Sequence, residues 1–199
     1  MTKPQASEGL DAVVVAETRI SDVDGERGRL VIAGADVEQL AATASYEVAL
    51  ARVLGAAGAR AIDPHELGRA RAAAWELLPR TGDALDALDG MEALRAALAH
   101  VHATGDDRAD AAAVIGAVPV FAAAWSRLRR ELPAVAPDPA LGHAVDYLRM
   151  TLGEPPDAVA ARALEQYLVT VIDHGMNAST FTARVIASTA SDLVSAIVG

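Results

Sequence analysis

The sequence predicts a mainly α-helical protein with one short β-hairpin near its amino terminus. Hydrophobic residues make up 52% of the chain but aromatic residues only 4%, because alanine supplies much of the apolar content. Alanine has the highest helix propensity and lets helices approach closely. β-Branched runs dominate only residues 12–32, whereas residues 36–199 carry repeated helix start signals and apolar residues spaced three and four apart. We therefore expect helices throughout residues 36–199, preceded by a hairpin.

The predicted hairpin consists of two short apolar runs around a turn. The first run covers residues 13–20 and begins with three consecutive valines, and the second covers residues 30–32. Residues 21–28 between them read SDVDGERG, and Asp and Gly are typical of turns. An isolated hairpin is only marginally stable in water, so we expect it to pack against the helices.

The first helices are predicted from their start signals. Asp36 precedes Gln39 by three residues, which is the spacing of a capping box. The run 63–66 is a stronger signal, with an acidic N-cap, proline at the first helical position and glutamate at the third. That helix should end before Pro79. Further helices are expected over residues 91–101 and 111–130, and Pro119 should kink or divide the second.

The later helices are predicted from periodicity. A helix opening at Asp138 and ending at Gly153 should bury one stripe: Leu141, Val145, Leu148 and Leu152. Residues 157–173 have the most regular period, and the expected buried residues are Leu164, Tyr167, Leu168, Val171 and Ile172. Residues 179–198 form one more predicted helix, lined with alanine and serine that suit close helix contact.

Charge and cysteine content exclude several classes of function. The chain has 17 Lys and Arg against 27 Asp and Glu, a formal net charge of −10, so we expect neither a nucleic-acid nor a membrane-surface partner. The absence of cysteine excludes disulfides and thiolate metal sites, and it is compatible with a reducing cytoplasm. The first nine residues lack the apolar core of a secretion signal, and no uncharged apolar run reaches about 18 residues. The expected location is cytoplasmic.

The candidate binding site is the segment 173–180, between the most periodic helix and the next one. The first turn of a helix has free backbone N–H groups and a positive dipole end, which favour a carboxylate. His174 and Asn177 would add side-chain hydrogen bonds to such an anion. The alternative is a plain turn in which Asn177 or Ser179 caps the next helix, and spacing alone favours this alternative.

The remaining histidines and arginines suggest no further site. Three histidines should be solvated: His65, His100 and His102. His143 lies beside a buried stripe and is expected to be a hydrogen-bonded packing residue. No histidine pair has a third ligand at metal-binding spacing, so we predict no metal site and no cofactor bound by this chain. A basic run should be a solvated helix end: Arg127, Arg129 and Arg130.

Several segments, in this order, resemble the citrate synthase family of bacterial citrate and 2-methylcitrate synthases. Residues 13–25 are similar to the family's opening hairpin, and residues 135–148 to the segment ahead of its binding site. The most specific resemblance lies in residues 163–199 and includes the following segments: 167–169, 173–174, 177–181, 183–185 and 187–189. The resemblance implies the mainly α-helical large domain of that family.

The resemblance also implies a reaction. Citrate synthases condense acetyl-CoA with oxaloacetate and then hydrolyse the thioester. By the match, His174 corresponds to the histidine that hydrogen-bonds oxaloacetate, and Asn177 lies in the same loop. The family usually has an acidic and then a bulky residue after this histidine, where the present chain has Gly175 and Met176. The family's Tyr-Arg-Gly after the hairpin is replaced by residues 32–34, Ile-Ala-Gly.

The family's catalytic residues are expected outside this chain. Family members are about twice as long, and a Gly-Pro-Leu-His-Gly motif with the enol-stabilising histidine follows the segment that matches residues up to Gly199. Three hypotheses follow: a split enzyme completed by a second chain with the carboxy-terminal half, a non-catalytic binding or regulatory module, and a truncated product. A homo- or hetero-oligomer fits the first two. The sequence does not separate citrate from 2-methylcitrate synthesis.

Overall fold

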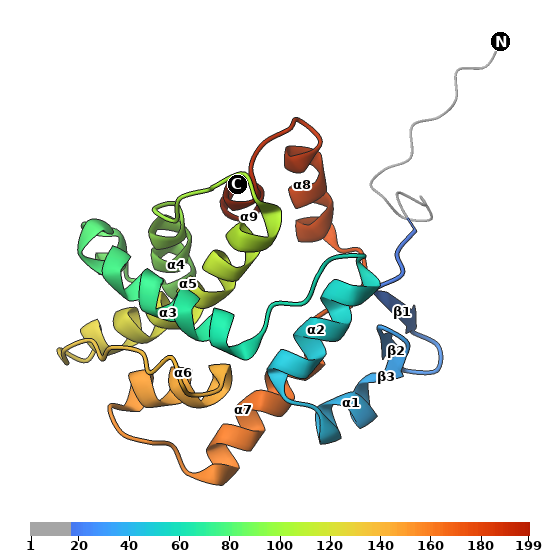
Figure 1. Cartoon of the computed structure of the whole chain (residues 1–199), viewed down its shortest axis with the longest axis horizontal. Helices are drawn as coiled ribbons and strands as arrows, with labels where there is room; N and C mark the ends of the chain where they lie inside the picture. The colour runs from blue at the N-terminus through green and yellow to red at the C-terminus, as the bar shows by residue number, and fades with distance from the viewer. Residues whose placement is uncertain (1–16) are drawn as a thin grey trace.

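The computed structural model describes residues 17–199 and confirms the mainly helical fold class. Within these residues a three-stranded sheet lies at one end of the molecule and α3 to α6 at the other (Figure 1). The helices are α1 (Val37–Thr43), α2 (Tyr46–Ala56), α3 (Pro64–Leu77), α4 (Gly90–Leu98), α5 (Asp107–Leu128), α6 (His143–Leu152), α7 (Ala158–Thr170), α8 (Ala178–Ala187) and α9 (Leu193–Val198). Two short 3-10 helices follow α3, at Leu78–Arg80 and Ala84–Asp86.

The predicted hairpin is present, but its first strand was misplaced. β1 (Ser21–Asp24) pairs antiparallel with β2 (Arg29–Ile32), and β2 pairs with β3 (Ala35–Asp36). β1 therefore occupies half of the segment assigned to the turn, because the turn itself needs only four residues. The valines at 13–15 lie outside the described residues, and the two-residue β3 was not predicted.

The sheet packs against the helices, as expected. Ile32 is fully buried and belongs to a core cluster with Leu40 of α1 and Val169 of α7. The sheet and the carboxyl end of α7 therefore share one apolar core, which brings the hairpin close to the segment that follows α7.

Local capping explains where the helices begin. Asp36 accepts hydrogen bonds from the backbone N–H groups of Glu38 and Gln39, and Asp63 forms the predicted capping box with Glu66. α3 ends before Pro79, as predicted. Asp106, a cap that the sequence analysis missed, starts α5 four residues earlier than predicted.

α5 is the central helix of the fold and packs against α3, α4 and α6. Pro119 lies buried inside it, and the expected division of this helix at Pro119 is wrong. Gly116 permits the close contact with α3, because a Cβ there would lie 2.6 Å from the Cβ of Ala70. α5 has the length and apolar composition of a membrane-spanning helix, but 56% of its most apolar stretch is buried inside the fold, so packing accounts for its apolar character.

α6 differs from its prediction in both start and buried face. Residues 138–141 form a turn, and the helix begins at His143 and ends at Gly153, which has φ +92°. The buried residues are His143, Ala144, Asp146 and Met150. The predicted apolar stripe is wrong because Asp146 faces inward to a buried arginine, and this rotates Leu152 to a 49% exposed position.

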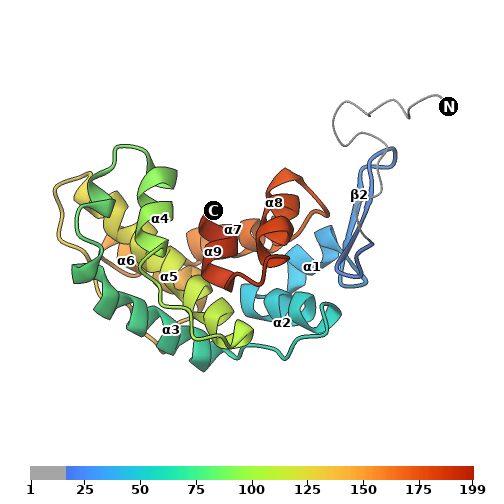
Figure 2. The ribbon, with the colours of Figure 1, turned by 90° about the horizontal axis from the view of Figure 1, so that it is seen from above.

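The predictions for the last two helical segments, residues 157–173 and 179–198, are also partly wrong. In α7 only Val169 is buried, whereas Tyr167 of the predicted stripe is 61% exposed and Val171 46% exposed. The helix expected over residues 179–198 divides into α8 and α9 at residues 188–192, where Ala190 adopts φ +62° and Asp192 caps α9. Figure 2 shows α8 and α9 side by side between the α4–α5 pair and the sheet.

Candidate functional site

The loop between α7 and α8 brings the two predicted site residues together. The Nδ2 group of Asn177 lies 3.1 Å from Nε2 of His174. The other amide atom of Asn177, Oδ1, accepts the backbone N–H of Thr180 at 2.8 Å, so Asn177 is the N-cap of α8. Because Oδ1 is the atom used in the cap, the amide group that faces His174 is Nδ2, which can only donate a hydrogen bond. In this arrangement Nε2 of His174 accepts the hydrogen bond, which leaves Nδ1 as the ring nitrogen that can donate.

The cap leaves hydrogen-bond donors available at the start of α8. Within residues 17–199, Asn177 satisfies the N–H of Thr180, and the N–H groups of Ala178 and Ser179 have no partner. The side chain of His174 is exposed. The plain-turn alternative is thus realised through Asn177, not Ser179, yet the same asparagine also orients the histidine. The role of His174 and Asn177 in anion binding stays a prediction.

The backbone of the loop turns at Gly175. This residue has φ +88°, a conformation that residues with a Cβ rarely adopt, and its N–H donates to Oδ1 of Asp173 at 3.0 Å. A Cβ at Gly175 would lie 3.4 Å from Cγ2 of Val23 in β1. Glycine at the position where the resembled family has an acidic residue therefore fits a left-handed turn that lies against the hairpin.

A second polar cluster, centred on the buried Asp146, is structural. Nε of Arg71 lies 2.7 Å from Oδ2 of Asp146, and the two side chains are 1% and 0% exposed. Nη2 of Arg149 adds a 2.9 Å contact to the other oxygen of Asp146, and the backbone N–H of Asp138 also donates to this carboxylate. The charge of Asp146 is therefore balanced by two arginines, and both of its carboxylate oxygens accept hydrogen bonds, as a buried charge requires. No spacing pattern in the sequence predicts this pair.

His143 belongs to the same cluster and is a packing residue, as predicted. Its ring stacks on Tyr46 with centroids 4.8 Å apart, and its Nδ1 lies 3.4 Å from Nη1 of Arg71. Burial, and then the charge of Arg71, lowers the pKa of His143 from 6.5 to about 4. Burial, and then the charge of Glu47, raises the pKa of Tyr46 to about 12. Neither group is poised for proton transfer near neutral pH.

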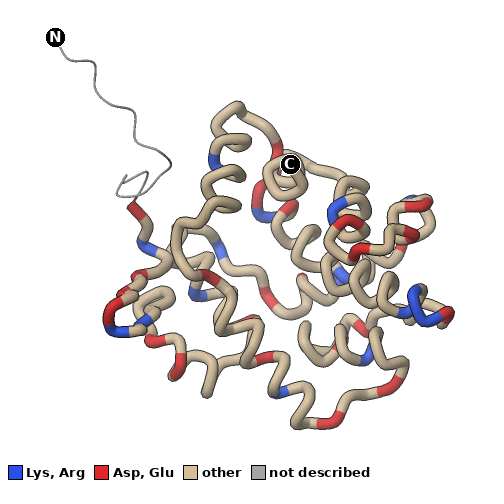
Figure 3. The backbone as a smooth tube through the Cα atoms, turned by 180° about the vertical axis from the view of Figure 1, so that it is seen from behind, with Lys and Arg blue, Asp and Glu red and all other residues tan. Residues whose placement is uncertain are grey.

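The other titratable candidates give no site. The three remaining predicted surface histidines are exposed: His65, His100 and His102. Arg127 was expected to be solvated but is only 7% exposed, because its guanidinium donates to the carbonyls of Pro133 and Thr151. Among residues 17–199 no three His, Asp or Glu side chains are grouped to hold a metal ion. Acidic and basic residues are spread over the sheet and the helices (Figure 3).

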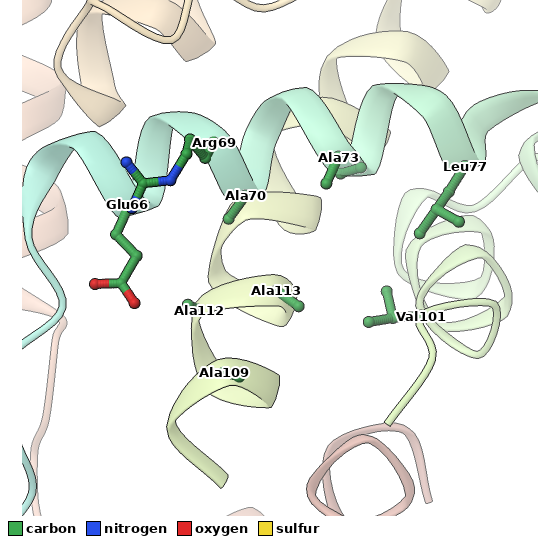
Figure 4. A pocket seen from close by; sticks show the side chains of 10 residues that line it. Glu66, Arg69, Ala70, Ala73, Leu77, Val101, Ala109, Ala112 and Ala113 are labelled. Atoms are coloured by element: carbon green, nitrogen blue, oxygen red, sulfur yellow. The ribbon is translucent and has the colours of Figure 1, made fainter. Parts of the chain in front are cut away.

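The groove between α3 and α5 is lined mainly by alanine (Figure 4). Its volume is about 360 Å³, and its charged residues lie at one end: Glu66 and Arg69. Glu66 is already paired with Arg108, whose hydrogen bonds lower the pKa of the carboxyl group. Within residues 17–199 the groove is therefore lined mainly by alanine methyl groups, with one carboxylate that is already paired and one arginine at its edge, a set that suggests no catalytic chemistry.

Two apolar grooves flank Val118 on α5. One, of about 230 Å³, lies between α5, α6 and α7 and includes the 61% exposed Tyr167. The other, of about 440 Å³, lies between α4, α5 and α9 and includes Met91 and Ile197, which are 72% and 47% exposed. Exposed apolar surfaces of this kind are typical of contacts with another polypeptide segment.

Comparisons with known proteins agree on one family. The family model described as "Citrate synthase, C-terminal domain" matches residues 9–199. The chain is 36% identical to a citrate synthase of Haloferax volcanii, over 95% of this chain and 54% of that protein. It is 33% identical to a 2-methylcitrate synthase of Mycobacterium tuberculosis, over 99% of this chain and 53% of that protein.

Solved structures agree with this. The fold matches citrate synthase from Thermotoga maritima with a TM-score of 0.81 at 29% identity, over 98% of this chain and 54% of that chain. Citrate synthase from Pyrobaculum aerophilum matches with a TM-score of 0.78 at 30% identity, over 95% and 52% of the two chains. The chain spans about half the length of the curated relatives it matches.

Proposed function

This chain belongs to the citrate synthase family, and we propose that it forms the oxaloacetate-binding part of an enzyme that condenses acetyl-CoA with oxaloacetate to give citrate. In this proposal the substrate of the chain is an oxaloacetate-like dicarboxylate, bound by His174 and Asn177. Acetyl-CoA is the second substrate of the complete enzyme, and the chain itself binds no cofactor or metal. We propose that this reaction takes place in the cytoplasm.

The observation that carries the proposal is the His174–Asn177 pair at the start of α8. Asn177 is held in place as the N-cap of α8 and contacts Nε2 of His174, so Nδ1–H of the imidazole, which has no partner within residues 17–199, can donate to a ligand. The N–H groups of Ala178 and Ser179 offer a second set of donors at the positive end of the helix dipole. A dicarboxylate with a keto oxygen has acceptors for both sets.

The condensation itself needs groups that this chain does not supply in our proposal. No residue of the chain is proposed as catalytic: the buried His143 and Tyr46 have pKa values far from neutral, and His174 has a binding role. We propose that a second chain with the carboxy-terminal half of the family fold provides the enol-stabilising and proton-abstracting groups. The two apolar grooves beside Val118 support this partner, because exposed apolar surface of this kind is typical of contacts with another polypeptide.

A non-catalytic binding or regulatory module is the second candidate. The observation that favours it is the departure at Gly175, which gives the loop a flexible residue where the family has an acidic side chain. In addition, α8 buries none of its residues, so the site lies on a weakly packed helix. Such a module would act without His174, whereas the enzyme would not.

Titration calorimetry with freshly dissolved oxaloacetate tests the binding step on the purified chain. We expect binding that is lost in His174→Ala and retained in His100→Ala, a control that removes an exposed histidine far from the loop along the chain. An equal affinity of the wild type and His174→Ala would contradict the proposed site.

Coenzyme A release from acetyl-CoA and oxaloacetate tests the reaction. The chain should be inactive alone and active when mixed with a carboxy-terminal half of the family. Activity of the chain alone would overturn the split arrangement. Inactivity of the mixture despite oxaloacetate binding would favour the binding module.

A further inference from the structure

One buried polar atom lies directly behind the candidate site. The hydroxyl Oγ of Ser21, on β1, is buried and has no hydrogen-bond partner within residues 17–199. A buried hydroxyl without a partner is costly, and folded proteins retain few such groups. An unpaired hydroxyl in a β-strand that contacts a functional loop therefore calls for an explanation.

Ser21 faces the loop that carries His174. A Cβ built on Gly175 would lie 3.9 Å from Oγ of Ser21 and 3.4 Å from Cγ2 of Val23. Ser21 is held firmly, because it pairs in the sheet with Ile32, which is fully buried in the core shared with α7. The strand is thus anchored to the core through Ile32, and the adjacent loop contains the one glycine at which its backbone can rotate most easily.

The loop has acceptors that match this donor. The N–H of Gly175 is bonded to Asp173, but within the described residues the carbonyl oxygens of His174, Gly175 and Met176 accept no hydrogen bond. Glycine tolerates changes of its backbone dihedrals that other residues resist. A rotation at Gly175 can therefore turn one of these carbonyls toward Ser21, and the peptide that rotates is attached to His174.

We propose that Ser21 is a positioning residue for His174. When an oxaloacetate-type dicarboxylate binds at the start of α8, the Ser21 hydroxyl donates to a backbone carbonyl of residues 174–176 and holds His174 in its binding orientation. The hydroxyl is unpaired in the free chain and paired in the complex, so it favours the bound state. This inference rests on the proposed function, because it deepens the account of the same site.

The proposal predicts opposite effects of Ser21→Ala on stability and binding. The substitution removes an unpaired buried hydroxyl, so the melting temperature of the free chain should stay equal or rise. The affinity for oxaloacetate should fall about fivefold or more, as expected for the loss of one hydrogen bond. A purely structural serine would show the reverse: a lower melting temperature with unchanged affinity.

The experiment combines calorimetric titration of oxaloacetate with thermal unfolding of the full chain. Ser21→Thr retains the hydroxyl and suits a strand, so it should bind within about twofold of the wild type. Ser191→Ala, at an exposed serine between α8 and α9, is the matched control and should leave both readouts unchanged.

Each outcome is decisive. Binding that needs His174 but is unaffected by Ser21→Ala would overturn the positioning role alone. An affinity loss accompanied by a lower melting temperature would also overturn it, because the serine would then be structural. If the wild-type chain fails to bind oxaloacetate, the proposed function falls and this inference falls with it.

Discussion

The region of α3, α5 and α6 buries more of its side chains than the region of α7, α8 and α9. The first buries an arginine and an aspartate at 1% and 0% exposure and pairs them, and it packs Phe121 and Met150 at 0% exposure. The second leaves Tyr167 61% exposed and buries no residue of α8 at all. The candidate site lies in the second region. Stability is therefore concentrated away from the site, and the site region has apolar surface left to contact other polypeptide.

The two phenylalanines of the chain test this comparison most directly, because there is one in each region. Phe121→Ala should reduce the free energy of unfolding by about 3–5 kcal/mol, since the ring is fully buried in α5. Phe181→Ala, in α8, should cost less than about half of that, because this ring is only partly buried. Chemical denaturation of the two variants measures both values. Equal losses would mean that the α8 region is packed as tightly as the core.

The pH dependence of stability sharpens the comparison. The pKa of His143 falls from 6.5 to about 4 on folding, so protonation favours the unfolded chain. Stability is complete above pH 6.5 and declines as the pH falls toward 4, by up to about 3 kcal/mol. The variant His143→Phe keeps a ring to stack on Tyr46 and should lose most of this decline.

Denaturation at pH 7 and at pH 4.5 provides the measurement. The control is His100→Ala, which removes an exposed histidine outside the buried cluster and should keep the wild-type dependence. The same steep decline in His143→Phe would assign the acid sensitivity to carboxylates instead.

The parts of the fold that sequence predicted well depend on local signals. The capping box at Asp63 and the stop at Gly153 each act within a few residues, and both are present in the structure. The resemblance to citrate synthases added the order of the segments, and with it the loop of His174. Periodicity alone could not predict whether the apolar stripe of α7 would be buried, because its burial depends on which other elements pack against that face of the helix.

The missed features depend on distant contacts or rare backbone conformations. Arg71 and Asp146 are 75 residues apart, and no spacing rule links them. Their pairing nevertheless decides which face of α6 is buried. Similarly, Ala190 ends the α8 segment with φ +62°, a conformation that alanine rarely adopts. The contact between Gly175 and β1 could not be predicted because β1 itself was assigned to a turn.

The smallest expected change in stability concerns Asn177, which both caps α8 and contacts His174. Asn177→Ser keeps a side-chain oxygen that can cap α8, so the free energy of unfolding should change by less than about 0.5 kcal/mol. Asn177→Ala removes the cap and should cost about 1 kcal/mol. Both variants lack the Nδ2 donor to His174, so both should bind oxaloacetate more weakly than the wild type. Calorimetry and denaturation of the pair therefore separate the cap from the site: if Asn177→Ser bound oxaloacetate like the wild type, Asn177 would be only a cap, and His174 would be oriented by the loop backbone and its contact with β1.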